Sequence, residues 1–126
     1  MAVRALRGAI TVDADDPDEI TRRTIALLET VFERNDLHEQ DVISILFTVT
    51  DDIRSLPPAA AARKLGLTDV PLLCVLEMPS EVGPDLCVRL MLHIETDRAR
   101  DELRHVFLRG ATVLRPELAE PGDDTL

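Results

Sequence analysis

The stretch VPLLCVLEMPSEVGPDLCVRLMLHIET, residues 70–96, decides the fold, because two strand-like runs flank a loop rich in Pro, Gly, Asp and Ser. The second run alternates with the period of two that is typical of a half-buried strand. One of its faces is wholly aliphatic and the other is mixed: Val88, Leu90, Leu92 and Ile94 against Cys87, Arg89, Met91 and His93. The alternation places Arg89 in the middle of a strand, on the mixed face.

The first run, Leu72 to Leu76, is apolar on both faces, and an acid, Glu77, follows it directly. A strand arginine and an acid at the end of the neighbouring run suggest a polar pocket on the sheet. The alternative interpretation is that Arg89 is an outward, solvated residue that pairs with Glu77 or Glu95. The pattern alone leaves both interpretations open.

Two helices and three further strands complete the expected elements. Asp16 and Pro17 form a helix-start signature, Gly66 can end a second helix, and Gly8 marks a bulge or a close approach in the first strand. The expected strands cover residues 2–12, 42–50 and 103–108, and the expected helices cover residues 17–34 and 58–65.

This order of elements predicts one mixed α/β (α+β) domain, residues 1–117, with both helices packed on one face of a mixed sheet. The acidic C-terminal tail, residues 118–126, contains Pro, Gly and Asp and is expected to be mobile. Two helices leave much of the sheet uncovered, and the strand at residues 42–50 is apolar on both faces. We therefore expect another copy of the chain to cover the rest.

Composition excludes several classes of function. The formal net charge is −10 and aromatic residues make up 2% of the chain, which argues against a nucleic-acid partner. No run of 18 or more apolar residues exists, so no membrane association is expected. The cations are 13 arginines and one lysine, and arginine offers a planar fork of donors that suits carboxylates.

Cysteine and histidine usage points to a protein of the cytoplasm without a metal. The chain has two cysteines and does not begin with a basic-then-apolar leader, so we expect reduced thiols in the cytoplasm. Its three histidines show no metal-ligand spacing with each other or with the cysteines. No catalytic Ser or His constellation is evident.

Five segments together resemble the trimeric, mixed α/β class of chorismate mutase. They are RALRGAITV (4–12), LPPAAAARKLG (56–66), VPLLCVLEM (70–78), LCVRLMLHIETD (86–97) and RHVFLRGATVLRPEL (104–118). The resemblance covers nearly the whole chain in order and extends to scattered polar residues. It implies a homotrimeric pseudo-barrel with active sites between subunits, and a Claisen rearrangement of chorismate to prephenate in aromatic amino-acid biosynthesis that uses no cofactor.

The resemblance also implies roles for individual residues. Arg89 would donate to the ether oxygen, Arg7 would hold a carboxylate, and Glu77, adjoined by Cys74, would accept the substrate hydroxyl. The remaining substrate-binding positions would be Arg63, Phe107, Leu114 and Arg115.

The chain departs from the family pattern at Phe107, and also at Pro57 and Ala60, and the matching pair Cys74 and Glu77 raises a geometric question. Members usually carry Tyr where this chain has Phe107, so we expect weaker substrate binding without loss of the rearrangement. Cys74 and Glu77 are three residues apart, so a regular strand would point them to opposite faces. Either a local bulge or the end of the strand turns Glu77 round, or Cys74 contributes its backbone N–H.

Two other functions remain as alternatives. A trimeric imine or enamine deaminase has a similar architecture with a strand arginine at its subunit clefts, and it would release ammonia from an imino acid. A non-catalytic carboxylate-binding module would bind chorismate without turnover, and its one indication is the absence of Tyr at Phe107.

Overall fold

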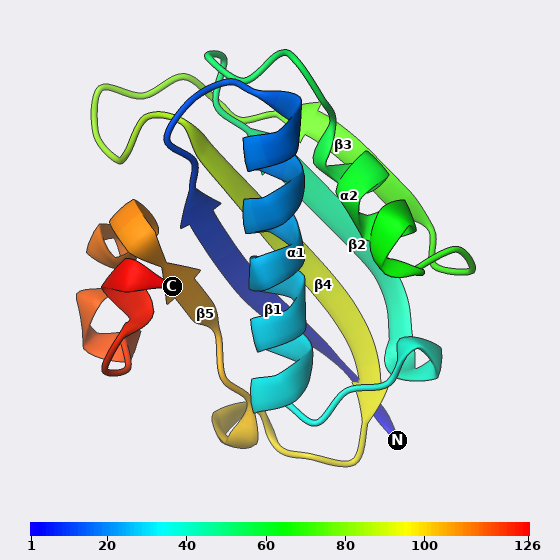
Figure 1. Ribbon diagram of the computed structural model, residues 1–126. Helices are drawn as coiled ribbons and strands as arrows, with labels where there is room; N and C mark the ends of the chain where they lie inside the picture. The colour runs from blue at the N-terminus through cyan, green and yellow to red at the C-terminus, as the bar shows by residue number, and fades with distance from the viewer.

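The computed structural model describes residues 1–126 and shows five strands in one mixed sheet with two helices on one face (Figure 1). The strand order is β3-β2-β4-β1-β5. β1 and β2 run antiparallel to β4, whereas β3 is parallel to β2 and β5 is parallel to β1. The strands are β1 Ala2–Thr11, β2 Val42–Val49, β3 Leu72–Leu76, β4 Cys87–Thr96 and β5 Val106–Leu108, and the helices are α1 Pro17–Arg34 and α2 Pro58–Leu65. The predicted fold class is confirmed.

The helix boundaries follow from local chemistry. Asp16 caps α1, since its side chain accepts the backbone N–H of Glu19 at 3.1 Å, and Pro17 takes the first position. Gly66 ends α2 with φ of 106°, a left-handed conformation that glycine adopts without strain. Both signals were read from the sequence, and both elements form where expected.

The core lies between the helices and the inner face of the sheet. Val88, Leu90, Leu92 and Ile94 of β4 are at most 2% exposed, as the alternation predicts. Gly8 of β1 brings α1 close to the sheet, because an added Cβ would lie 3.2 Å from Leu90 Cδ1 and 3.3 Å from Leu27 Cδ1. The register of β1 with β4 is unbroken at Gly8, so the glycine marks a close approach and not a bulge.

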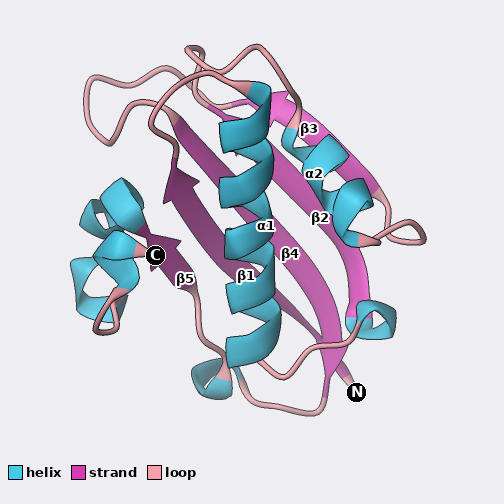
Figure 2. Cartoon of the chain, in the orientation of Figure 1, coloured by secondary structure: helices cyan, strands magenta, loops and turns pink.

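The outer face of the sheet is only partly covered by this chain, because the C-terminal 3₁₀ segment packs on Ala9, Cys87 and Phe107 and leaves the β3 side open. Both helices lie on the other side, as Figure 2 shows. Val3, Leu46, Leu73 and Val75 remain between 37% and 60% exposed on strands β1, β2 and β3. An apolar surface of this kind on a sheet is typical of an interface with another protein chain.

The C-terminal segment forms short 3₁₀ turns beside β5 (Figure 1). Asp123 is 1% exposed and accepts two hydrogen bonds from the Arg34 guanidinium, at 2.6 and 3.2 Å. The mobility of residues 118–126 stays a prediction, and the structure adds an anchor to α1 that the sequence did not suggest.

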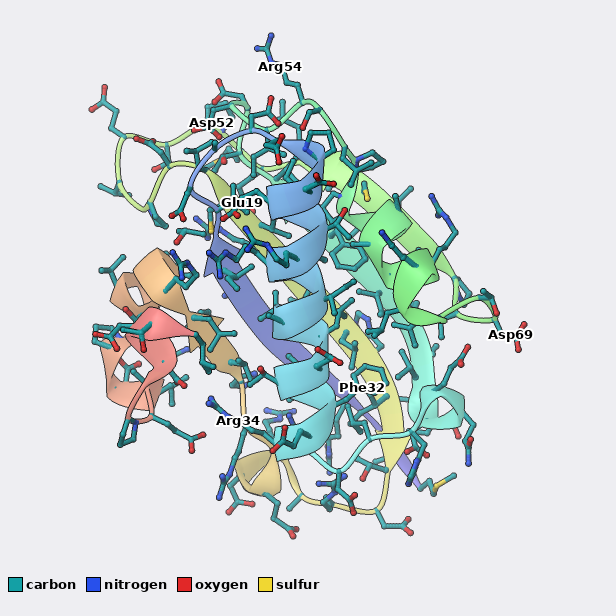
Figure 3. The ribbon with its side chains drawn as sticks, viewed as in Figure 1. Glu19, Phe32, Arg34, Asp52, Arg54 and Asp69 are labelled. Atoms are coloured by element: carbon teal, nitrogen blue, oxygen red, sulfur yellow. The ribbon has the colours of Figure 1, made fainter.

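Glu19, in the first turn of α1 (Figure 3), ties the helix to the preceding loop. It accepts hydrogen bonds from the Arg22 and Arg23 side chains and from the Asp13 backbone N–H. The hydrogen bond from Arg23, supported by these other partners, outweighs burial and lowers the pKa of the carboxyl to about 2. The ionised form therefore stabilises the folded state, and this contribution is lost as the pH falls from 4.5 towards 2.

We expect Glu19→Gln to lower the free energy of unfolding by about 1–3 kcal/mol at pH 7, because Gln cannot accept as an anion. The difference between variant and wild type should shrink as the pH falls from 4.5 towards 2. Urea unfolding at pH 7 and pH 3 measures both values. Glu29→Gln, at an exposed position of the same helix, is the matched control and should change stability by less than about 0.5 kcal/mol. An equal loss at both pH values would contradict the assignment.

Candidate active site

The structure brings Arg89 and Glu77 together on the outer face of the sheet. Arg89 of β4 is flanked by Ala9 of β1 and Thr48 of β2, and Glu77 directly follows β3. The Arg89 Nε and Glu77 Oε1 atoms are 3.6 Å apart, and the two side chains are 21% and 27% exposed. Arg89 is therefore a half-buried residue whose partner is Glu77, not Glu95.

The ion pair leaves one donor of Arg89 unsatisfied. The Nε atom is buried and has no hydrogen-bond partner, since 3.6 Å to the carboxylate is too long for a hydrogen bond. A buried donor without an acceptor costs about 1–3 kcal/mol, so most such groups in native proteins find a partner. An acceptor atom of a ligand would satisfy this donor.

Thr48 fixes the position of Glu77. Its hydroxyl donates to Glu77 Oε1 at 2.5 Å, and its place opposite Arg89 in the β2–β4 pair puts all three side chains on one face. Sequence reasoning missed this residue, because β2 was interpreted only as an apolar strand. The available signal was a hydroxyl near the end of a mostly apolar run.

A cavity of about 560 Å³ adjoins this group of side chains. Glu77, Arg89 and Leu114 line it together with the loop from Met78 to Gly83. Gly83 lies close above Arg89, because a Cβ built on it would be 3.4 Å from Arg89 Nη2. The volume falls within the range of about 300–1,000 Å³ that small-molecule sites occupy.

Arg7 and Phe107 lie on the same outer face. Arg7 is two residues along β1 from Ala9, the neighbour of Arg89, and Ala9 also pairs with Phe107 of β5. The Arg7 Cζ atom is 5.8 Å from the centroid of the Phe107 ring, within the range of a cation–π contact. Five of the predicted site residues therefore share this face: Arg7, Glu77, Arg89, Phe107 and Leu114.

The Cys74 thiol lies on the other face of the sheet. Cys74 pairs with buried Phe47, and its Sγ accepts the Ala59 N–H of α2 at 3.4 Å. Glu77 continues the regular β3 alternation, since its N–H donates to Val49 O at 2.8 Å, so no bulge turns it round. The same alternation directs the Cys74 N–H to the free edge of β3. Of the two arrangements considered from the sequence, only the backbone contribution of Cys74 is compatible with this geometry.

The two remaining arginines are not brought to the cavity within one chain. Arg63 is exposed in the last turn of α2, on the helix side of the sheet. Arg115 is exposed between two 3₁₀ turns, and its Nε donates to Glu117 Oε1 at 2.5 Å.

Nowhere in the chain do three or more His, Cys, Asp or Glu side chains converge as metal ligands would. No helix has the length and apolar character that crossing a membrane requires.

Cys87 shares this face with Arg89 by the alternation of β4, but the chain itself covers it. The residue is fully buried among Ala9, Phe107 and Ala111. Burial raises the pKa of its thiol to about 11, although the nearby Arg89 opposes the rise. The neutral thiol therefore adds no charge beside Arg89.

Comparison with known proteins agrees with this geometry. Residues 3–118 match the family described as Chorismate mutase type I. The chain belongs to this family.

Individual relatives are similar over almost their whole length. Chorismate mutase AroH of Bacillus subtilis (strain 168) is 40% identical over 120 residues, which cover 94% of each chain. Chorismate mutase AroH of Thermus thermophilus is 41% identical over 117 residues, which cover 92% of this chain and 96% of that one. A solved chorismate mutase of Clostridium thermocellum is 43% identical, with a TM-score of 0.85 over 87% of this chain and 98% of that one. These matches confirm the predicted family and isomerase class, and they favour the mutase over the deaminase and the binding module.

We expect Thr48→Val to lower kcat/KM for chorismate roughly tenfold, because loss of one hydrogen bond to a charged group frees the Glu77 carboxylate. Steady-state kinetics measures the effect, and thermal unfolding should show a folded variant, since Val keeps the branched shape. Thr48→Ser keeps the hydroxyl and should stay within about threefold of the wild type. Wild-type kinetics in Thr48→Val would remove Thr48 from the site.

Proposed function

We propose that the cavity beside Arg89 binds chorismate and converts it to prephenate in one step without a cofactor. The observation that carries this proposal is the Arg89 guanidinium, which belongs to a residue that lines the cavity and whose Nε has no hydrogen-bond partner. In the rearrangement a C–O bond breaks while a C–C bond forms, and negative charge grows on the ether oxygen. A fixed donor aimed at that oxygen stabilises the transition state more than the bound substrate.

The neighbouring residues have separate roles in this proposal. Glu77, held by Thr48, accepts the hydroxyl of the substrate, and its charge balances Arg89 when the cavity is free. Arg7 holds a substrate carboxylate, as its guanidinium forms no ion pair within the chain. No proton transfer is required, which is consistent with the neutral Cys87 thiol.

We further propose that the working enzyme is a homotrimer with each site completed by a neighbouring chain. The exposed apolar residues of β1, β2 and β3 support an interface on the outer face. The β3 edge with the Cys74 N–H and the α2 side chain of Arg63 lie away from the cavity of their own chain. Both features gain a role if they reach the cavity of the next subunit.

The two unpaired cysteines support a cytoplasmic location, where thiols stay reduced.

Arg89→Lys is expected to lower kcat by about 10²–10³, because lysine keeps the charge and loses the planar fork that is directed at the ether oxygen. The assay is the loss of chorismate absorbance in plain buffer with a chelator and no added cofactor. Size-exclusion chromatography should show the same oligomer for variant and wild type.

Two outcomes of this assay would count against the proposal. Turnover close to that of the wild type in Arg89→Lys would remove the central role of Arg89. A wild-type protein that leaves chorismate unchanged at high concentration would remove the reaction itself. Arg54→Lys, at an exposed position outside the cavity, controls for the general effect of replacing an arginine.

Phe107→Tyr should lower KM for chorismate by about three- to tenfold and leave kcat within about twofold. The Phe107 ring is 2% exposed beside Arg7, so a tyrosine hydroxyl would gain a hydrogen bond to a substrate carboxylate worth about 1 kcal/mol. Phe107→Leu has no hydroxyl and should not lower KM. An unchanged or higher KM in the tyrosine variant would show that this position does not contact the substrate.

A further inference from the structure

A hollow of about 370 Å³ beside the start of β5 is lined by arginine and histidine side chains together with Val3 and Ala5, and by no acidic side chain. Its lining comes from β1, from β4, from the 3₁₀ turn at residues 100–102 and from the residue that precedes β5. The polar members are Arg4, Arg7, His93, Arg100 and His105. The hollow adjoins the part of β1 that β5 does not reach, because β5 pairs only with Gly8, Ala9 and Ile10.

The arginines of the hollow are not neutralised within the chain. Arg4, Arg7 and Arg100 form no ion pair, and Arg4 donates only to the Arg98 carbonyl, at 3.4 Å. The chain has 24 acidic residues against 14 basic ones, so unpaired arginines that line one hollow require an explanation.

The acids on adjoining stretches do not supply the missing charge. Asp97 pairs with the N-terminal amine at 3.7 Å, Glu102 accepts the Ala99 N–H at 2.8 Å, and Glu117 accepts from Arg115. Asp101, in the same turn as Arg100, is exposed and does not line the hollow. Glu95, opposite Val3 on β4, is also exposed and outside the lining.

His105 adds a hydrogen-bond donor to these charges. Its Nδ1 accepts the Arg7 backbone N–H at 2.9 Å, which leaves the proton of the neutral ring on Nε2. Burial lowers the pKa of the imidazole, and the positive charges of Arg115 and Arg7 lower it further. An anion bound in the hollow would oppose the effect of these charges and raise the pKa.

We propose that the hollow is a binding subsite for a small oxyanion with two negative charges, the chemistry shared by inorganic phosphate and a dicarboxylate. Three arginine forks and an imidazole donor suit such a ligand. Arg7 belongs both to this subsite and to the outer face that carries Arg89, so a bound anion competes with the substrate for Arg7. Only this last step rests on the proposed mutase function.

The test is a pH titration of the His105 imidazole by NMR in the full chain, with and without inorganic phosphate at constant ionic strength. The expected result is a higher midpoint for His105 with phosphate, and no comparable rise with chloride. Arg100→Gln removes one charge of the hollow and should weaken phosphate binding about tenfold, the effect of one charge-assisted hydrogen bond. Arg54→Gln removes an exposed arginine elsewhere and should leave phosphate binding unchanged.

Three results would overturn the subsite: an unmoved midpoint, an equal rise with chloride, or equal weakening in the two variants. The competition is tested separately, since phosphate should raise KM for chorismate without lowering kcat in the wild type, and do so less in Arg100→Gln. A KM that phosphate does not change would overturn the competition. A chain that binds phosphate at His105 but never converts chorismate would refute the mutase function and leave the subsite standing.

Discussion

The placement of Arg89 within β4 is the constraint on which the site depends. Its neighbours Val88 and Leu90 are buried against the helices, so the period of the strand forces Arg89 onto the opposite face. A register slip of one residue would bury the guanidinium in the aliphatic core, at a cost that its ion pair with Glu77 could not offset. The same core packing that stabilises the fold therefore also directs the Arg89 guanidinium to the outer face.

The two faces of the sheet differ because one packs against the helices and the other carries the candidate site. The inner face is closed by α1 and α2 and its core is mainly aliphatic, with Phe47 as its one fully buried aromatic residue and Gly8 allowing the helix to approach. The outer face combines exposed aliphatic residues near the β3 edge with Arg7 and Arg89 on the middle strands. The outer face therefore carries both exposed apolar surface and charged groups, whereas the inner face is used for packing alone.

Much of this arrangement could be predicted from local patterns. The alternation of β4, the Asp16 cap and the Gly66 stop each depend on a few adjacent residues, and the structure confirms them. Thr48 and the Asp123 anchor could not be predicted, because each acquires its role from a partner 29 or 89 residues away. Nothing in the tail sequence distinguishes Asp123 from its exposed neighbour Asp124.

The charge of the chain and the charge of its site have opposite signs. A net charge of −10 opposes the approach of a dianion, and at physiological ionic strength this opposition is screened beyond about 8 Å. Within that distance the local groups decide: Arg89 is paired with Glu77, whereas Arg4, Arg7 and Arg100 form no ion pair. Acids in other parts of the chain have their own partners, as Glu19 has Arg23 and Asp123 has Arg34. Binding of an anion is therefore a property of how the ion pairs are distributed over the fold, and the overall composition does not reveal it.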